Sequence, residues 1–177
     1  MLVLMVFRVI KVHKGSNTTI STTSGGITLS GVMSGNAALN KISANTLTLS
    51  GANTYTGGTS VGAGILSINS DASLGAVPAS VTASSITLGG GALQATASMI
   101  LNANRGITMT ANSGLAATSS YTLVYGGIIA GNFGLTINGA NQTGTVSLAV
   151  ANNYTGGTTV SAGTLGVYHN GSMGGLS

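Results

Sequence analysis

Three observations in the sequence predict an all-β fold, a parallel β-helix (solenoid). Charged residues make up 3% of the chain and hydrophobic residues 43%, whereas disordered proteins combine low hydrophobicity with high net charge. The apolar residues alternate with small polar ones in short runs bounded by Gly and Asn, which is the pattern of many short strands. These runs recur about every 20 residues, as expected when each coil stacks on the one before it.

The strands of a first series have two apolar residues around one small residue. Their first members are Ile27, Leu47, Leu66, Ile86, Ile107, Val146 and Leu165. The steps between them are nearly uniform, except that the step from Ile107 to Val146 is close to two rungs. A second series interleaves with the first at nearly the same spacing and begins at Val61, Val81, Leu101, Tyr121 and Val160. The shared period predicts about 20 residues per rung and roughly eight rungs.

The side chains of each predicted rung divide between the core and the outside. Apolar members point inward and stack from rung to rung, whereas Thr and Ser point outward, because β-branched Thr suits a pleated surface. Gly and Asn take the corners, since both tolerate positive φ. The outward positions of the first series are therefore expected to line one face at rung spacing: Thr28, Thr48, Ser67, Thr87, Thr108 and Ser147.

Residues 1–24 differ from the rest of the chain. An apolar run precedes the positive charges there, which is the reverse of a signal peptide, and the run is too short to span a membrane. Two interpretations stay open for this stretch. It contains either a cap strand, whose Arg8, Lys11 and Lys14 protect an exposed sheet edge, or a non-native leader ahead of a β-helix at residues 25–177.

An internal duplication organises the chain. The stretch Ala52–Leu66 (ANTYTGGTSVGAGIL) returns later in the chain as Ala151–Leu165 (ANNYTGGTTVSAGTL). The copies extend over residues 47–75 and 146–174. Because a repeat decides the architecture, its matching residues are interpreted as structural. They are Asn53, Tyr55, Thr56, Gly57, Gly58, Thr59, Val61, Gly64 and Leu66, and then Asn152, Tyr154, Thr155, Gly156, Gly157, Thr158, Val160, Gly163 and Leu165.

Roles within the first copy follow from the predicted rung. Val61 and Leu66 are expected in the core, and Asn53 and residues 57–58 at corners. Tyr55, like its counterpart in the second copy, is predicted to cover apolar surface while its hydroxyl reaches water. A sugar-stacking platform is the alternative for the two rings, but they lie about five rungs apart along the solenoid.

The repeated stretch resembles a known secretion repeat. Residues 47–59, followed by Val61 and Gly64, and the copy Asn152–Leu165 look like the autotransporter-associated β-strand repeat, also called the passenger-associated transport repeat. The resemblance covers roughly residues 26–175. It implies a right-handed β-helical passenger segment of a Gram-negative bacterium, in which the repeat aids secretion across the outer membrane and folding.

The resemblance also implies partners. These are neighbouring passenger rungs and a C-terminal β-barrel translocator outside this chain. The sequence shows neither a secretion signal nor that barrel, so we expect it to be a piece of a passenger.

Catalysis is disfavoured by the scarcity of acidic groups. Asp71 is the only acidic residue, whereas glycoside hydrolysis ordinarily uses two carboxylates and a calcium site several. Asp71 and His169 are close to five rungs apart, too far for a catalytic triad. We expect Asp71 in a turn, because Asn170 replaces it in the second copy. The spacing of His13 and His169 does not suit a metal, and the chain has no Cys, so neither a metal nor a cofactor is expected.

The net charge of +4 does not predict nucleic-acid binding. Three of the five positive charges lie close together near the start of the chain, and Lys41 and Arg105 are isolated. A nucleic-acid site needs several phosphate contacts on one face.

The leading hypothesis is therefore a structural segment of a secreted or surface-exposed passenger. It acts in outer-membrane secretion, passenger folding and surface display, with adhesion to host or cell-surface glycans as a further role. The alternative is a ligand-binding solenoid, either ice-binding or a carbohydrate adhesin, that uses the outward Thr/Ser face. An enzyme and a transmembrane segment are not expected.

Overall fold

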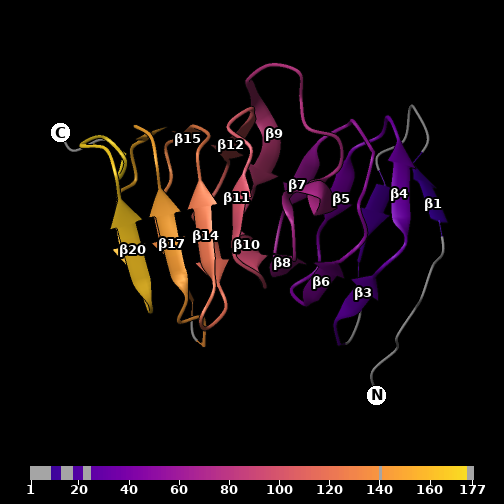
Figure 1. Cartoon of the computed structure of the whole chain (residues 1–177), viewed down its shortest axis with the longest axis horizontal. Coiled ribbons are helices and arrows are strands. Elements are labelled where there is room, and N and C mark those ends of the chain that lie inside the picture. The colour runs from indigo at the N-terminus through magenta and orange to yellow at the C-terminus, as the bar shows by residue number, and fades with distance from the viewer. Residues whose placement is uncertain (1–8, 13–17, 22–24, 140, 175–177) are drawn as a thin grey trace.

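A computed structural model describes residues 9–12, 18–21, 25–139 and 141–174. These residues form 20 short strands and one turn of 3-10 helix, η1 (Asp71–Leu74). The strands stack side by side along one axis, which confirms the predicted all-β solenoid (Figure 1).

Three parallel sheets form the walls of the solenoid. Sheet 1 has seven strands in the order β3 (Ile27–Leu29), β6 (Thr46–Leu49), β8 (Ile65–Ile68), β10 (Ala92–Ala95), β13 (Ser113–Ala117), β16 (Leu135–Ile137) and β19 (Thr158–Val160). Sheet 2 also has seven, namely β2 (Thr18–Ile20), β5 (Leu39–Lys41), β7 (Thr59–Val61), β9 (Thr82–Leu88), β12 (Arg105–Met109), β15 (Ile129–Gly131) and β18 (Asn153–Tyr154). Sheet 3 has four, namely β11 (Met99–Leu101), β14 (Thr122–Tyr125), β17 (Thr145–Leu148) and β20 (Thr164–Val167).

The number of turns is close to the prediction. Sheets 1 and 2 each hold seven strands, so the described residues make about seven turns where roughly eight are predicted. From β11 onward each turn visits sheets 2, 1 and 3 in succession. From β5 to β10 the chain alternates between sheets 2 and 1.

The core lies between the sheets and consists of stacked aliphatic rows. One row of sheet 1 runs through Leu47, Leu66, Leu93 and Leu115, which pair in register and are completely buried. Burial of such rows is the main favourable contribution to folding, because apolar surface leaves water. The predicted inward position of the apolar members is therefore confirmed for this row.

The predicted register is wrong beyond Ile68. Leu66 pairs with Leu93 in sheet 1, and not with Ile86. Ile86 lies in sheet 2, where Thr59 is its partner. One rung is thus longer than the others, because η1 and the chain that follows it are inserted between β8 and β9.

The two predicted strand series consequently do not correspond to two rows. Ile107 lies in sheet 2, and Val146 and Leu165 lie in sheet 3. In the second series, Val81 and Tyr121 lie outside strands and are 61% and 41% exposed. The spacing from Leu66 to Ile86 equals an ordinary rung by coincidence, so the long rung left no break in the sequence pattern.

Strands occur within the predicted leader. β1 (Val9–Val12) pairs in parallel with β4 (Val32–Gly35), and β2 is the first strand of sheet 2. Among the described residues, sheet 2 therefore begins at Thr18, ahead of the predicted boundary at residue 25. Arg8, His13 and Lys14 lie outside the described residues.

Among the residues that the structure describes, none forms a helix of the length and apolarity needed to cross a membrane.

Candidate functional site

The repeated motif forms the same closed turn in both copies. The Tyr55 side chain is 1% exposed, and its hydroxyl shares a 2.7 Å hydrogen bond with Oγ1 of Thr59. Tyr154 is completely buried, and its hydroxyl shares a 2.5 Å hydrogen bond with Oγ1 of Thr158. The prediction that these hydroxyls reach water is wrong, because a threonine four positions later supplies a partner inside the fold. Neither ring is available as a sugar platform.

Burial also keeps the phenols neutral. It raises the pKa of Tyr55 to about 12, although the bond from Thr59 acts in the opposite direction. The pKa of Tyr154 is raised by burial as well. Both side chains therefore act as hydrogen-bonded structural groups at physiological pH.

Two glycines of each copy allow the rungs to approach. A Cβ on Gly57 would lie 2.2 Å from the carbonyl carbon of Ala37, and Gly156 has the same relation to Phe133. At the far end of the repeat, Gly75 has φ of +81°, and a Cβ there would lie 2.9 Å from the ring of Tyr55. Gly174 contacts Tyr154 in the same way. The repeat therefore specifies how one rung packs on the next.

The repeat asparagines bridge three successive rungs. The side chain of Asn53 accepts a 2.8 Å bond from the Met33 amide and donates a 2.7 Å bond to the Ser73 carbonyl. Asn152 does the same between Ile129 and Ser172, at 2.8 and 2.6 Å. Neither Asn53 nor Asn152 has the positive φ on which the predicted corner placement was based. The side-chain bridge is what requires asparagine at these positions. Outside the repeat, Asn138 bridges the Ala117 amide and the Gly144 carbonyl.

The predicted core positions are buried in the first copy only. Val61 and Leu66 are completely buried, whereas Val160 is 48% exposed and Leu165 is partly buried. The difference follows from position, because β19 and β20 are the last described strands of their sheets.

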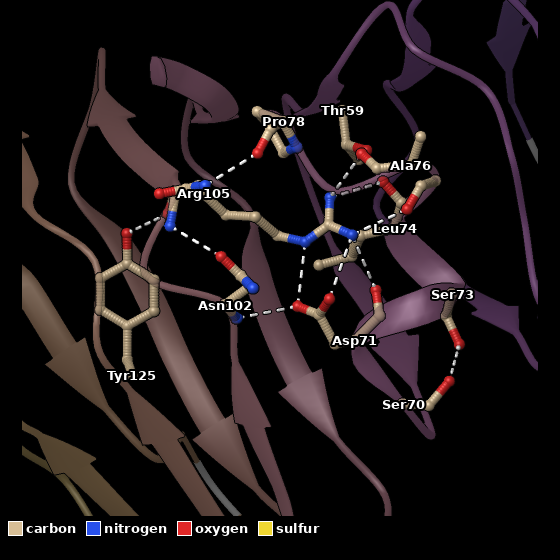
Figure 2. A network of polar contacts seen from close by, with 12 residues as sticks. Thr59, Ser70, Asp71, Ser73, Leu74, Ala76, Pro78, Asn102, Arg105 and Tyr125 are labelled. Carbon is tan, nitrogen blue, oxygen red and sulfur yellow. Dashed lines mark hydrogen bonds and ion pairs between the residues drawn. The ribbon is translucent and has the colours of Figure 1, made fainter. Parts of the chain in front are cut away.

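Asp71 and Arg105 form an ion pair that the sequence did not predict. Nε of Arg105 donates to Oδ1 of Asp71 at 2.9 Å, and the guanidinium also donates to the carbonyls of Asp71, Leu74, Gly75 and Ala76 (Figure 2). Arg105 is 1% exposed, so its isolation in the sequence does not make it a surface charge. Asp71 lies in the first turn of η1, as predicted for a turn residue.

The other isolated cation is buried as well. Lys41 occupies an inward position of β5, and its ammonium donates to the carbonyls of Ser43 at 2.5 Å and Ala63 at 2.7 Å. Burial lowers the pKa of Lys41. The described basic residues beyond β1 therefore stabilise the fold and present no patch to an anionic partner.

The predicted outward ladder is divided among three sheets. Thr28, Thr48 and Ser67 pair in register on sheet 1, but the next partner of Ser67 is Gln94. The remaining members lie elsewhere: Thr87 pairs with Thr108 in sheet 2, and Ser147 lies in sheet 3. The prediction of one continuous face is wrong for two reasons. The long rung places Thr87 and Thr108 in sheet 2, and the later rungs have 22 or 23 residues where about 20 are predicted, so that Ser147 falls in sheet 3. Ser67 and Ser147 are also buried.

Hollows of ligand size lie on the described part of the structure. One, of about 450 Å³, lies beside the first repeat turn, and another, of about 370 Å³, lies on the outer side of sheet 1 near Gly114. The described residues include no cluster of three or more potential metal ligands. His169 is exposed, and its Nδ1 accepts a bond from the Gly171 amide.

Comparison with known proteins agrees with the repeat geometry. The passenger-associated-transport-repeat family matches residues 39–68 and 140–167. The chain is 40% identical over 149 residues to the adhesin BmaC autotransporter of Brucella suis biovar 1 (strain 1330). The match covers 84% of this chain and 4% of that relative. No solved structure is significantly similar to the chain. The closed Tyr–Thr turn of each copy, residues 55–59 and 154–158, thus lies within a segment that matches the passenger-associated-transport-repeat, the repeat that the sequence resembles.

Proposed function

We propose that this chain is a stalk segment of an autotransporter passenger and acts in secretion-coupled folding and surface display. The observation that carries the proposal is the 40% identity over most of the chain to an autotransporter adhesin. The repeat geometry supports it, because each rung is completed by hydrogen bonds from its neighbours, as Asn53 illustrates. New rungs can therefore add to folded ones in sequence.

A structural role, and not catalysis, is part of this proposal. The single carboxylate side chain of the protein, Asp71, is held by Arg105 and by the Asn102 amide. It is thus engaged in the scaffold and is poorly placed to act as a general acid or base. Adhesion is the second candidate function, favoured by the name of the relative, and would take place on the cell surface or on a secreted passenger.

The experiment places this chain in the Brucella adhesin in place of the stretch that it matches. Two deletions are compared by flow cytometry and by protease accessibility on intact cells. Deleting residues 151–165 removes the second repeat turn, and we expect surface display to become slower. Deleting residues 110–131 removes one complete rung in register, because Met109 and Gly131 occupy equivalent positions, and we expect display to be retained. Equal display of both deletions would contradict a role for the repeat in secretion.

A further inference from the structure

The long rung leaves one strand partly unpaired. On one side β9 pairs with β12, with Thr82 opposite Arg105 and residues 86–88 opposite residues 107–109, and a shift in register separates these two parts. On its other side β9 pairs with β7 only from Ile86 onward. Residues 82–85 therefore extend past the end of β7 and have no strand neighbour on that side among the described residues.

A hollow lies next to this free edge. Its volume is about 450 Å³, within the range of ligand sites. It is lined on one side by the first repeat turn, including Thr56 and Gly58, and on the other by Ser84 and Ser85. A Cβ on Gly58 would lie 3.1 Å from the Ser85 carbonyl oxygen, so the turn and the strand are close at the inner end.

The outer wall is the inserted segment that makes this rung long. Val77, Pro78 and Ala79 line the hollow, and Val77 is 43% exposed. Arg105 fastens the segment by donating to the Ala76 carbonyl, and Nδ2 of Asn104 donates to the Pro78 carbonyl at 2.9 Å. The wall is thus held in place by two side chains of the following rung, as Figure 2 shows for Pro78 and Ala76.

The chemistry of the lining is neutral. Arg105 contributes its five N–H groups to Asp71 and to carbonyls of the turn, so no donor of this cation is left for an anion. The other lining side chains are hydroxyl, apolar or absent, and the Tyr55 ring is buried with its hydroxyl bonded to Thr59. The lining therefore offers no carboxylate, no amide side chain and no exposed aromatic ring to a carbohydrate.

We propose that this gap accepts an extended, uncharged peptide segment of another polypeptide, which adds as a strand to the free edge of β9. An unpaired strand edge is a template for another chain, and main-chain hydrogen bonds supply the affinity in this mode. The lining combines the hydroxyl groups of Thr56 and Ser84 with the apolar groups of Val77 and Pro78. A segment that alternates Thr or Ser with small aliphatic residues fits both. The proposal does not depend on the passenger role.

The test titrates the purified chain with acetyl-Thr-Val-Thr-Val-Thr-amide and follows backbone amide signals by NMR. We expect a Kd below about 1 mM, with shifts concentrated at residues 82–85. The same peptide with every backbone amide N-methylated should bind at least about tenfold more weakly, because it cannot donate to a strand edge. Equal binding of both peptides, or no binding of the first, would overturn the proposal.

A pair of variants locates the site. Thr56→Trp fills the gap, whereas Thr155→Trp changes the equivalent exposed residue of the second copy, which lines neither hollow. We expect peptide binding to weaken at least about tenfold in the first variant and to persist in the second. Circular dichroism checks that both remain folded. If Thr56→Trp unfolds, Ser84→Pro, which blocks the edge directly, replaces it. Binding that survives a folded gap variant, or binding of maltohexaose in place of the peptide, would refute strand addition here.

Discussion

The guanidinium of Arg105 lies 2.9 Å from the carboxylate of Asp71, 34 positions earlier, and joins the inserted segment of the long rung to the next rung. The Asp71 side chain is 22% exposed and that of Arg105 is 1% exposed, so the cation is much the more buried partner. Asp71 also accepts a 3.0 Å bond from the Asn102 amide. The pair thus closes the rung that departs from the regular spacing.

Removing the cation should destabilise the chain strongly. Arg105→Met removes the donors that Arg105 supplies to Asp71 and to the carbonyls of Leu74 and Gly75, so we expect the free energy of unfolding to fall by about 3 kcal/mol. Asp71→Asn should also lower it by about 3 kcal/mol, because the guanidinium, which is 1% exposed, loses its counter-charge. Urea denaturation measures both values. An Arg105→Met variant as stable as the parent would show that the pair is dispensable.

The bridging asparagines can be tested against an adjacent control. Asn152 is 7% exposed and bonds to Ile129 and Ser172, whereas the next residue, Asn153, is exposed. Asn152→Ala leaves two buried main-chain groups unpaired and should lower the free energy of unfolding by about 2 kcal/mol. Asn153→Ala should change it by less than about 0.5 kcal/mol. Equal effects in chemical denaturation would argue against the bridge.

The closed turn predicts coupling between its two hydroxyls. Tyr55→Phe leaves Oγ1 of Thr59, which is 3% exposed, without its partner and should destabilise the chain by about 1 kcal/mol. Thr59→Val should do the same, and the double variant should lose less than the sum of the two changes. Additive effects in the double-mutant cycle would mean that the hydrogen bond contributes nothing.

Stability should also depend on alkaline pH through Tyr55. Burial raises its pKa from 10.0 to about 12, so between these values the folded state retains a proton that the unfolded state releases. The contribution of the neutral phenol is complete below pH 10 and is lost as pH rises toward 12. Between pH 10 and 12, the free energy of unfolding of the parent should fall with pH more steeply than that of Tyr55→Phe. The difference in slope should reach at most about 1.4 kcal/mol per pH unit. Parallel pH profiles would contradict this origin.

The sequence was sufficient for the fold class because alternation and period are local. The positions of Leu47 and Leu66 in one core row follow from the alternation of apolar residues, and both side chains are buried as expected. The register was not predictable in the same way. The segment inserted after Ile68 contains Val81, which follows Val61 at the spacing of an ordinary rung. Only the strand pairing in the folded chain shows that Leu66 pairs with Leu93 and not with Ile86.

Long-range polar contacts escaped prediction for a related reason. Arg105 and Asp71 belong to different rungs, and the pairing depends on the length of the segment between them. The composition nevertheless pointed to this ion pair. In a chain with 3% charged residues, Asp71 is the only acidic residue and Arg105 is one of two isolated cations. The Tyr55–Thr59 bond had a clearer signal, since the spacing of four is kept in both copies.

Cross-linking tests the long rung most directly, because the native chain contains no Cys. Ser67 and Gln94 are register partners on neighbouring strands, whose spacing of about 4.8 Å suits a disulfide. Mild oxidation of the Ser67→Cys/Gln94→Cys variant should therefore give an intramolecular disulfide in high yield, as should Thr48→Cys/Ser67→Cys, the positive control. The Ser67→Cys/Thr87→Cys variant, whose positions a uniform period would bring together, should stay reduced. Efficient closure of Ser67→Cys/Thr87→Cys, with none for Ser67→Cys/Gln94→Cys, would contradict the long rung and the gap beside it.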